Sequence, residues 1–271
     1  MGAEKEFRRR LVIVLLLAML VWVASALLGA GIVGEIIAAL MLTTSVYLIA
    51  RMYRRQKQLL EQLTLMSRRN ESALNLCATL PLRAPLPPAG GWAASADLLC
   101  LLETTILREK PEVIVEASSG ISTLVCAYCL EKTGRGKVIS LEHDAEFARR
   151  SAEQLKTHSL GHIAEVAVAP LVPHEIGGAR WLWYDTSALA QIDRIDLIFI
   201  DGPPGDIQPE ARYPALPLLW PRLKTGGIVL LDDADREQER EIVARWRREF
   251  GDSLQAEHIP LEKGAYVFRK I

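Results

Sequence analysis

Apolar residues dominate the first fifty positions of the chain. Leu11–Leu28 is one apolar run, and Ile32–Ala50 is a second run interrupted only by Glu35 and a few hydroxyl side chains. Each run is long enough to cross a bilayer as a helix, and Gly29-Ala30-Gly31 leaves room for little more than a tight turn between them. The pattern predicts a transmembrane helical hairpin over residues 1–50, with spans at 11–28 and 32–50.

Basic residues flank the two runs on the same side of the predicted hairpin. They are Lys5, Arg8, Arg9 and Arg10 before the first run, and Arg51, Arg54, Arg55 and Lys57 after the second. The positive-inside rule places both ends in the cytoplasm, so a multi-pass protein of the cell (inner) membrane with a cytoplasmic C-terminal domain is expected. A cleaved signal peptide ending at Ala24-Ser25-Ala26 is the alternative, which the second run and its basic flank disfavour.

Beyond residue 51, apolar residues recur at intervals of seven. One series is Met52, Leu59, Met66, Ala73 and Leu80, and its companion is Gln56, Leu63, Asn70 and Cys77. This spacing is typical of a dimeric coiled coil with polar residues at two core positions. It predicts a helical stalk over residues 51–80 and a homodimer formed through it; a solvated single helix with a chance repeat is the alternative.

After a Pro/Gly-rich linker at 81–91, strand-like and helix-like patterns alternate through residues 92–271. Strands are expected at 113–115, 138–141, 164–169, 195–200 and 228–231, with a closing hairpin at 254–259 and 265–269. Helices are expected at 97–110, from about 122 onward, and at 145–158, 215–223 and 237–250. This alternation predicts an α/β domain with a Rossmann-like, doubly wound, seven-stranded sheet and a site along the carboxyl ends of its strands.

Small residues follow the first predicted strand. Glu116 ends this strand, and Ala117-Ser118-Ser119-Gly120 gives a turn that lets the backbone approach a ligand closely. Ser122 or Thr123 can cap the helix that follows. Glu142, at the end of the next strand, can hold the hydroxyls of a ribose. These features favour a nucleoside ligand, although any βαβ crossover can carry a small turn and a strand-end acid.

Acidic residues also end the fourth and fifth predicted strands. Asp201, Asp232 and Asp233 should meet at one edge of the sheet, where a carboxylate could act as a general base or bind a divalent cation. The alternative is that they only cap loops and helices. Arg212 and His174 are candidate acceptor-side groups.

The cysteines and the charge pattern exclude several classes of function. Cys126 and Cys129 form a C-x-x-C without a second pair and lie in an apolar helix, so buried apolar roles are expected rather than metal or redox chemistry. Cys77 and Cys100 fit a reducing compartment. No basic stripe with interleaved aromatic residues is present in the C-terminal domain, so nucleic acid is not an expected partner.

Four segments together resemble the class I S-adenosylmethionine-dependent methyltransferases. They are the loop Glu116–Ser122, which is similar to the E-x-G-S-G-x-S-T loop of an O-methyltransferase-like subgroup, and Ile195–Gly205, Ala211–Leu216 and Gly226–Arg236. The resemblance covers most of residues 92–271. Ser118 departs from it by replacing a glycine, and Ala169-Pro170-Leu171 departs by replacing an acid that contacts adenine.

The resemblance implies S-adenosylmethionine as cofactor, with a divalent cation as a further candidate. The cofactor-binding residues would be Glu116, Ser118, Ser119, Gly120, Ser122, Thr123, Glu142, His143 and Asp201. The catalytic residues would be Asp201 and Asp233, and a cation would bind Asp201, Asp232 and Asp233. Asp201-Gly202-Pro203-Pro204-Gly205 lacks the aromatic residue of many amino-group methyltransferases, which favours an oxygen acceptor.

The leading interpretation is a membrane-anchored methyltransferase. It would O-methylate a small-molecule, glycan or lipid-linked acceptor at the cytoplasmic face. The first alternative is a catalytically degenerate methyltransferase-like domain that serves as a membrane scaffold or partner-binding module, which Ser118 favours. The second alternative is a nicotinamide-dependent oxidoreductase, which the lack of a full G-x-G-x-x-G disfavours.

Overall fold

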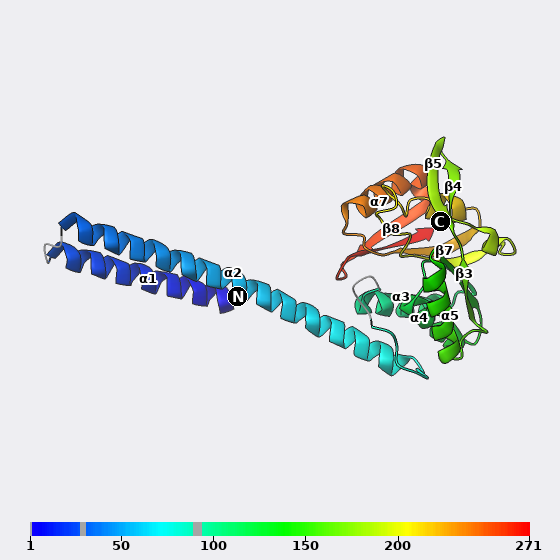
Figure 1. Cartoon of the computed structure of the whole chain (residues 1–271), viewed down its shortest axis with the longest axis horizontal. Coiled ribbons are helices and arrows are strands. Elements are labelled where there is room, and N and C mark those ends of the chain that lie inside the picture. The colour runs from blue at the N-terminus through cyan, green and yellow to red at the C-terminus, as the bar shows by residue number, and fades with distance from the viewer. Residues whose placement is uncertain (1, 28–30, 89–93) are drawn as a thin grey trace. The chain divides into compact units, whose positions relative to one another are not determined.

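The computed structural model describes residues 2–27, 31–88 and 94–271 (Figure 1). The chain divides into two compact units, one reaching to Ser67 and one from Arg68 to Ile271. The predicted turn at Gly29-Ala30 and the end of the predicted linker, residues 89–91, lie outside the described residues. The predicted first residue of the C-terminal domain, Trp92, lies outside them as well.

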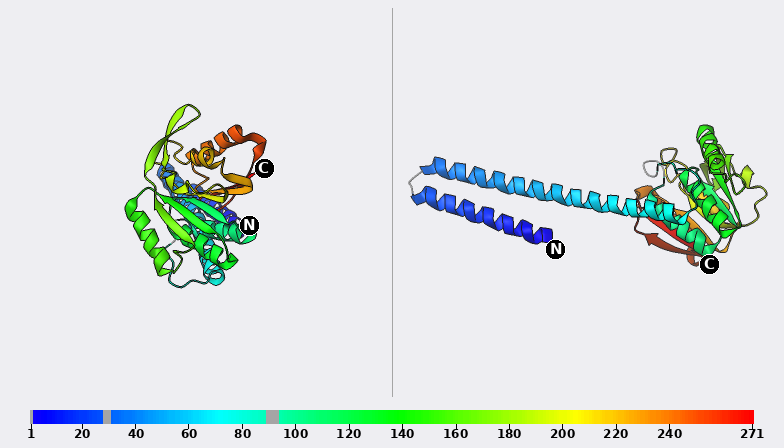
Figure 2. Two further views of the ribbon diagram at one scale, coloured as in Figure 1. Left: turned by 90° about the vertical axis from the view of Figure 1, so that its right-hand side faces the viewer. Right: turned by 90° about the horizontal axis from the view of Figure 1, so that it is seen from below.

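The first unit consists of two long helices. Helix α1 (Gly2–Leu27) and the first part of α2 (Gly31–Thr79) run side by side in opposite directions (Figures 1 and 2). Large apolar side chains such as Leu16 and Met41 are more than half exposed. Among the described residues, one helix, Gly34–Thr79, contains a stretch long and apolar enough to cross a membrane, and none of that stretch is buried. Length and composition thus support the second predicted span, and the complete transmembrane hairpin stays a prediction.

The C-terminal end of α2 belongs to the second unit. Leu76 and Leu80 are buried in its core, the Cys100 thiol donates to the Ser72 carbonyl over 3.1 Å, and the Lys132 ammonium donates to the Thr79 carbonyl over 2.9 Å. Leu80 is therefore a core residue of the domain, whereas the other positions of both heptad series are exposed.

Seven strands form the main sheet of the second unit, in the order β3-β2-β1-β6-β7-β9-β8. Their bounds are β1 (Val113–Ala117), β2 (Lys137–Glu142), β3 (Ala164–Val168), β6 (Ile195–Ile200), β7 (Leu223–Leu231), β8 (Leu254–Ile259) and β9 (Ala265–Lys270). Strands β3, β2, β1, β6 and β7 are parallel, and β9 runs antiparallel to both of its neighbours. The predicted seven-stranded Rossmann-like sheet is confirmed, including the closing hairpin.

Helices cover both faces of this sheet, because successive strand residues point to opposite sides. Ile114 and Leu197 pack in one apolar cluster with α3, α4 and α5, whereas Val115 and Ile198 pack in a second cluster with α6 and α7. The helix bounds are α3 (Ala96–Glu109), α4 (Ile121–Thr133), α5 (Ala145–Thr157), α6 (Ala215–Leu219) and α7 (Glu237–Phe250). Helix α6 is shorter than predicted, since Leu223 already belongs to β7.

A second, two-stranded sheet was not anticipated from the sequence. Strands β4 (Leu171–Ile176) and β5 (Ala179–Tyr184) pair as an antiparallel hairpin that projects from the domain (Figure 2). Gly177 and Gly178 join them with φ values of +58° and +78°, which suits a two-residue hairpin turn. His174 therefore lies in a strand. Pro173 within it obscured the pattern.

Candidate functional site

The turn between β1 and α4 exposes its backbone at the edge of the sheet. Ser118 and Gly120 have φ values of +120° and +145°. The Ser118 N–H donates to the Leu141 carbonyl over 3.0 Å, and the Gly120 N–H donates to the Thr123 hydroxyl over 3.1 Å. A Cβ added to Gly120 would meet no heavy atom within 4 Å. The space in front of the turn is therefore open to a ligand.

Glu116 lies beneath this turn and has no exposed surface. Its carboxylate accepts hydrogen bonds from the hydroxyls of Ser122 and Ser140 and, over 2.6 Å, from that of Thr123. Burial raises the pKa of Glu116, and the three hydroxyl donors oppose that rise. The side chain ties the first turn of α4 to β1 and β2 and so braces the turn from below.

Glu142 faces the turn from the end of β2. Its Oε2 accepts a hydrogen bond from the Ser119 hydroxyl over 3.0 Å, and its Oε1 accepts one from the Asp144 N–H over 3.1 Å. The Nδ1 of His143 lies 3.1 Å from Oε1, and the Ser119 hydroxyl also lies 2.9 Å from that of Ser151. A carboxylate placed here can accept hydrogen bonds from a hydroxyl-bearing ligand that lies over the turn.

Three aspartates gather where β6 and β7 end. One carboxylate oxygen from each of Asp201, Asp232 and Asp233 lies within 4.8 Å of the others. The Asp201 N–H donates to the Ala117 carbonyl over 3.1 Å, which joins this cluster to the end of β1. The predicted convergence of strand-end acids at one edge of the sheet is therefore observed.

Arg212 lies inside this aspartate cluster rather than on the acceptor side, where the sequence suggested it. Its side chain is 4% exposed, and its Nη2 donates to Asp233 Oδ2 over 2.9 Å and to Asp201 Oδ1 over 3.2 Å. Its Nε lies 3.8 Å from Glu239 Oε1. Sequence reasoning missed this role, because Arg212 and Asp233 lie 21 residues apart in a loop and at a strand end.

Burial controls the protonation of the aspartate cluster. It raises the pKa of Asp201 well above its usual range, although Arg212 opposes this effect. It also raises the pKa of Asp232, to which the charge of Asp233 adds. Asp201 can therefore hold a proton under conditions in which an exposed aspartate cannot.

Tyr184 lies between the part of the site at Glu142 and the part at Asp201. In the sequence, only its place at a strand end hints at this role. Its ring makes an edge contact with His143, with centroids 6.0 Å apart. A Cβ on Gly202, next to Asp201, would overlap the Tyr184 hydroxyl. Burial raises the pKa of Tyr184 well above its usual value, so the hydroxyl stays protonated. Gly202 is required here because the tyrosine occupies the space of a side chain.

The histidine of β4, the two tryptophans of β5 and the paired cysteines of α4 make mainly structural contacts. The His174 Nε2 contacts the Tyr184 carbonyl over 3.1 Å. Trp183 is fully buried, and Trp181 packs on Tyr213 with centroids 4.6 Å apart, so both tryptophans serve the core. Cys126 and Cys129 are fully buried, and burial raises the pKa of both thiols, that of Cys129 to about 12. That range makes them poor nucleophiles.

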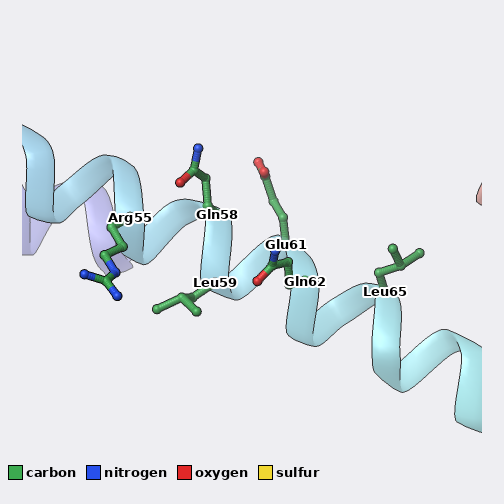
Figure 3. Close-up of a pocket in the computed structure, with 6 residues that line it drawn as sticks. All are labelled: Arg55, Gln58, Leu59, Glu61, Gln62 and Leu65. Carbon is green, nitrogen blue, oxygen red and sulfur yellow. The ribbon is translucent and has the colours of Figure 1, made fainter.

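A surface depression on α2 offers no comparable chemistry. Its lining residues are Arg55, Gln58, Leu59, Glu61, Gln62 and Leu65. All six come from one helix, and Figure 3 shows that their side chains point in different directions. The candidate site is therefore the edge of the sheet where β1, β2, β6 and β7 end.

Residues 117–234 match a family model described as a methyltransferase domain. The matched range begins at the last residue of β1 and ends just after Asp233. It includes the turn, Glu142 and the aspartate cluster. No curated protein matches the sequence of this chain.

Solved methyltransferase structures share the fold. The SAH-bound methyltransferase PaMTH1 of Podospora anserina is 15% identical with a TM-score of 0.50, and the likeness covers 66% of this chain and 80% of that one. A methyltransferase from Geobacter sulfurreducens is 13% identical with a TM-score of 0.50, over 80% of this chain and 98% of that one. The C-terminal part of this chain thus combines the sequence pattern of a methyltransferase domain with the fold of solved methyltransferases.

Proposed function

We propose that this chain is a class I S-adenosylmethionine-dependent methyltransferase. The observation that carries the proposal is the methyltransferase-domain match over residues 117–234, which spans the open turn, Glu142 and the aspartates. The bound state of PaMTH1 supports the choice of cofactor, because SAH is the demethylated product of S-adenosylmethionine. Assignment to the E-x-G-S-G-x-S-T loop subgroup stays a prediction.

In this proposal the cofactor lies over the turn after β1. Glu142 accepts hydrogen bonds from the ribose hydroxyls, beside His143, and the Ser118-Ser119-Gly120 backbone lines the cofactor. Glu116, Ser122 and Thr123 act from beneath by fixing the turn, since all three side chains are buried and bonded to one another. Backbone groups of Ala169-Pro170-Leu171 would serve the adenine in place of an acid.

Asp201 is the better placed of the two proposed catalytic aspartates. Its side chain is 12% exposed, against 3% for Asp233. In methyl transfer the acceptor oxygen forms a bond to the methyl carbon while the carbon–sulfur bond breaks, and the acceptor proton passes to a base. Positioning supplies most of the rate enhancement and a general base adds to it. Asp201 would accept the proton. Asp233 would hold the neighbouring cations, Arg212 and Arg236, in place.

The proposed acceptor is an oxygen atom. No aromatic residue follows Asp201-Gly202-Pro203-Pro204 to stack on an amine. An acceptor that is lipid-linked, or a glycan or small molecule delivered at the membrane, fits a domain joined to apolar helices. The proposed location is the inner membrane, with two spans and with both termini and the catalytic domain in the cytoplasm, as the basic flanks of the spans favour.

A parallel homodimer through α2 is also proposed. Met52, Leu59, Leu63 and Met66 are each more than half exposed on this helix, and a coiled coil would bury them against a second copy. Cys77 is exposed and belongs to the companion heptad series. In a parallel, in-register pair the two Cys77 thiols would face each other, so mild oxidation should give a covalent dimer that Cys77→Ser abolishes. Failure to cross-link, together with a monomeric mass in detergent, would exclude this dimer.

Calorimetry tests the cofactor site directly. The full chain in detergent should bind S-adenosylmethionine and SAH with micromolar affinity. Glu142→Gln should weaken both about 10- to 100-fold, or about 1.4–2.8 kcal/mol, because the ribose hydroxyls lose a charged acceptor. Glu165→Gln, an exposed change on the neighbouring strand β3, should bind as the unaltered chain does.

The scaffold alternative has one structural observation in its favour. Ser118 carries a side chain at φ +120°, where a glycine would leave the approach to the turn freer. A folded chain that binds neither ligand would exclude the enzyme and favour this scaffold.

A further inference from the structure

Asp201, Asp232 and Asp233 have the spacing of a cation site. One oxygen from each lies within 4.8 Å of the others, and carboxylate oxygens are the ligands that Mg²⁺, Ca²⁺ and Mn²⁺ prefer. Asp232 Oδ2 and Asp233 Oδ1 are buried and have no hydrogen-bond partner among the described residues. These features alone would favour a divalent metal.

The guanidinium of Arg212 already lies between two of these carboxylates. Its Nη2 is 2.9 Å from Asp233 Oδ2 and 3.2 Å from Asp201 Oδ1. Its Nη1 and Nη2 also donate to the main-chain carbonyls of Asp232 and Asp201, each over 3.0 Å. The side chain is 4% exposed. A metal bound through Asp201 Oδ1 or Asp233 Oδ2 would have to displace a buried arginine that makes four hydrogen bonds. A metal bound through the other carboxylate oxygens would lie beside the charge of that arginine.

Two further cations reach Asp233. Arg236 Nη1 lies 2.9 Å from Oδ2, and Lys263 Nζ lies 3.8 Å from Oδ1. Three cationic side chains therefore surround three aspartates, with Glu239 on the far side of Arg212. A divalent ion would add two positive charges beside a fixed guanidinium in a region of low dielectric, where like charges repel strongly. The residues present do not fit a resident divalent metal.

We propose that Arg212 is the built-in cation of this cluster. It forms ion pairs with Asp201 and Asp233, holds the Asp201 carboxylate at the end of β6, and excludes divalent metals from the three aspartates. Arg212 is a positioning residue in this proposal, because it acts through Asp201. Only the catalytic use of the Asp201 carboxylate rests on the proposed methyltransferase function. The exclusion of metal is a property of the cluster itself.

Mn²⁺ titration of the full chain in detergent, followed by electron paramagnetic resonance, tests the exclusion. The unaltered chain should bind no Mn²⁺ at this cluster at about 1 mM, the weak end of protein cation sites. Arg212→Met should bind Mn²⁺ at least tenfold more tightly, because it frees Asp201 Oδ1 to join the two partnerless oxygens. Mn²⁺ should then raise the melting temperature of Arg212→Met alone, and adding Asp201→Asn should abolish both effects.

Two results would overturn the proposal. One is Mn²⁺ binding by the unaltered chain that Asp201→Asn removes. The other is an Arg212→Met chain that folds and binds no Mn²⁺, since the arginine would then be excluding nothing. If Arg212→Met does not fold, the unaltered chain and its Asp201→Asn variant still decide whether a metal binds.

S-adenosylmethionine binding, measured separately with and without EDTA, keeps the two proposals apart. Unchanged cofactor affinity in EDTA agrees with a cluster that holds no metal. Loss of cofactor binding in EDTA that Mn²⁺ restores would contradict it. Failure to bind the cofactor under any condition would contradict the proposed function and leave the Mn²⁺ result standing.

Discussion

Glu116 and Asp201 stand at the ends of the adjacent strands β1 and β6, yet different chemistry holds their carboxylates. Glu116 accepts hydrogen bonds from three hydroxyl groups, whereas Asp201 lies beside the buried guanidinium of Arg212. Glu116 is fully buried and serves the turn from beneath, whereas Glu142 accepts a hydrogen bond from the neutral Ser119 hydroxyl and keeps the capacity to accept those of a ligand. Asp201 and Asp233 are already paired with Arg212. Together these three side chains form a fixed platform in the part of the site at Asp201.

Removing Arg212 should have the largest effect, because it takes away the cation that distinguishes Asp201 from Glu116. Arg212→Met leaves buried carboxylates without their partner, which typically costs about 3–5 kcal/mol of the free energy of unfolding. Arg240→Met, on the exposed surface of α7 and 3.9 Å from Asp235, should change it by less than about 0.5 kcal/mol. Urea unfolding in detergent measures both, and an Arg212→Met chain as stable as the original would show that the platform does not depend on its arginine.

The pH dependence of stability should reveal the buried acid at Glu116, whose charge no arginine among the described residues balances. Burial raises the pKa of this acid in the folded chain, so the folded state binds its proton more tightly than the unfolded state does. Stability therefore falls as pH rises from the unfolded pKa of about 4.3 through the folded pKa, by about 1.4 kcal/mol for each unit of difference.

Glu116→Gln should make that decline shallower, because glutamine does not titrate, whereas Asp201 and Asp232, whose pKa values burial also raises, still do. The measurement is urea unfolding at a series of pH values between about 4 and 8. Glu165→Gln, which changes an exposed glutamate, should leave the decline intact. A Glu116→Gln profile parallel to that of the original chain would mean that hydroxyl donors alone compensate the buried charge.

Local patterns predicted most of the fold because each element carries its own signal. The apolar run Ile195–Ile200 and the amphipathic pattern of Glu237–Phe250 match β6 and α7 at both ends. Pro173 and the polar residues around it hid β4, although Gly177-Gly178 marked the hairpin turn. A strand with few apolar neighbours is specified by its partner rather than by its own sequence.

The candidate site was predictable in part for the same reason. Strand-end acids are visible in a sequence, so Glu142, Asp201 and Asp233 could be named, and the sheet order brings the two aspartates together. The place of Arg212 depends on how a loop folds back over β6 and β7, and a buried arginine looks no different from an exposed one in a sequence. Tyr184 was missed likewise, since its contact with Gly202 joins distant segments.

The hydrogen bond from the Ser119 hydroxyl to the Glu142 carboxylate should matter less than Arg212. Ser119→Ala removes the donor to Glu142, which lies 3.0 Å away, and a hydrogen bond to a charged group contributes about 1.5 kcal/mol at the low end. S-adenosylmethionine affinity should fall about tenfold, with Ser253→Ala in the distant turn after α7 as the matched control. Calorimetry decides; equal affinities would mean that Glu142 needs no support from the turn.

The smallest effect should come from Ser118, whose side chain stands at φ +120°. A non-glycine residue in such a conformation costs on the order of 1–3 kcal/mol, and glycine relieves this strain while giving up about 0.5–1 kcal/mol in unfolded-state entropy. Ser118→Gly should therefore raise the free energy of unfolding by roughly 0–2.5 kcal/mol, the difference between these two ranges. Ser119→Gly, one residue along and without a positive φ, should lower it instead. If Ser118→Gly is destabilising too, the Ser118 side chain makes a contribution that outweighs its strain, and the serine belongs to the binding chemistry of the turn.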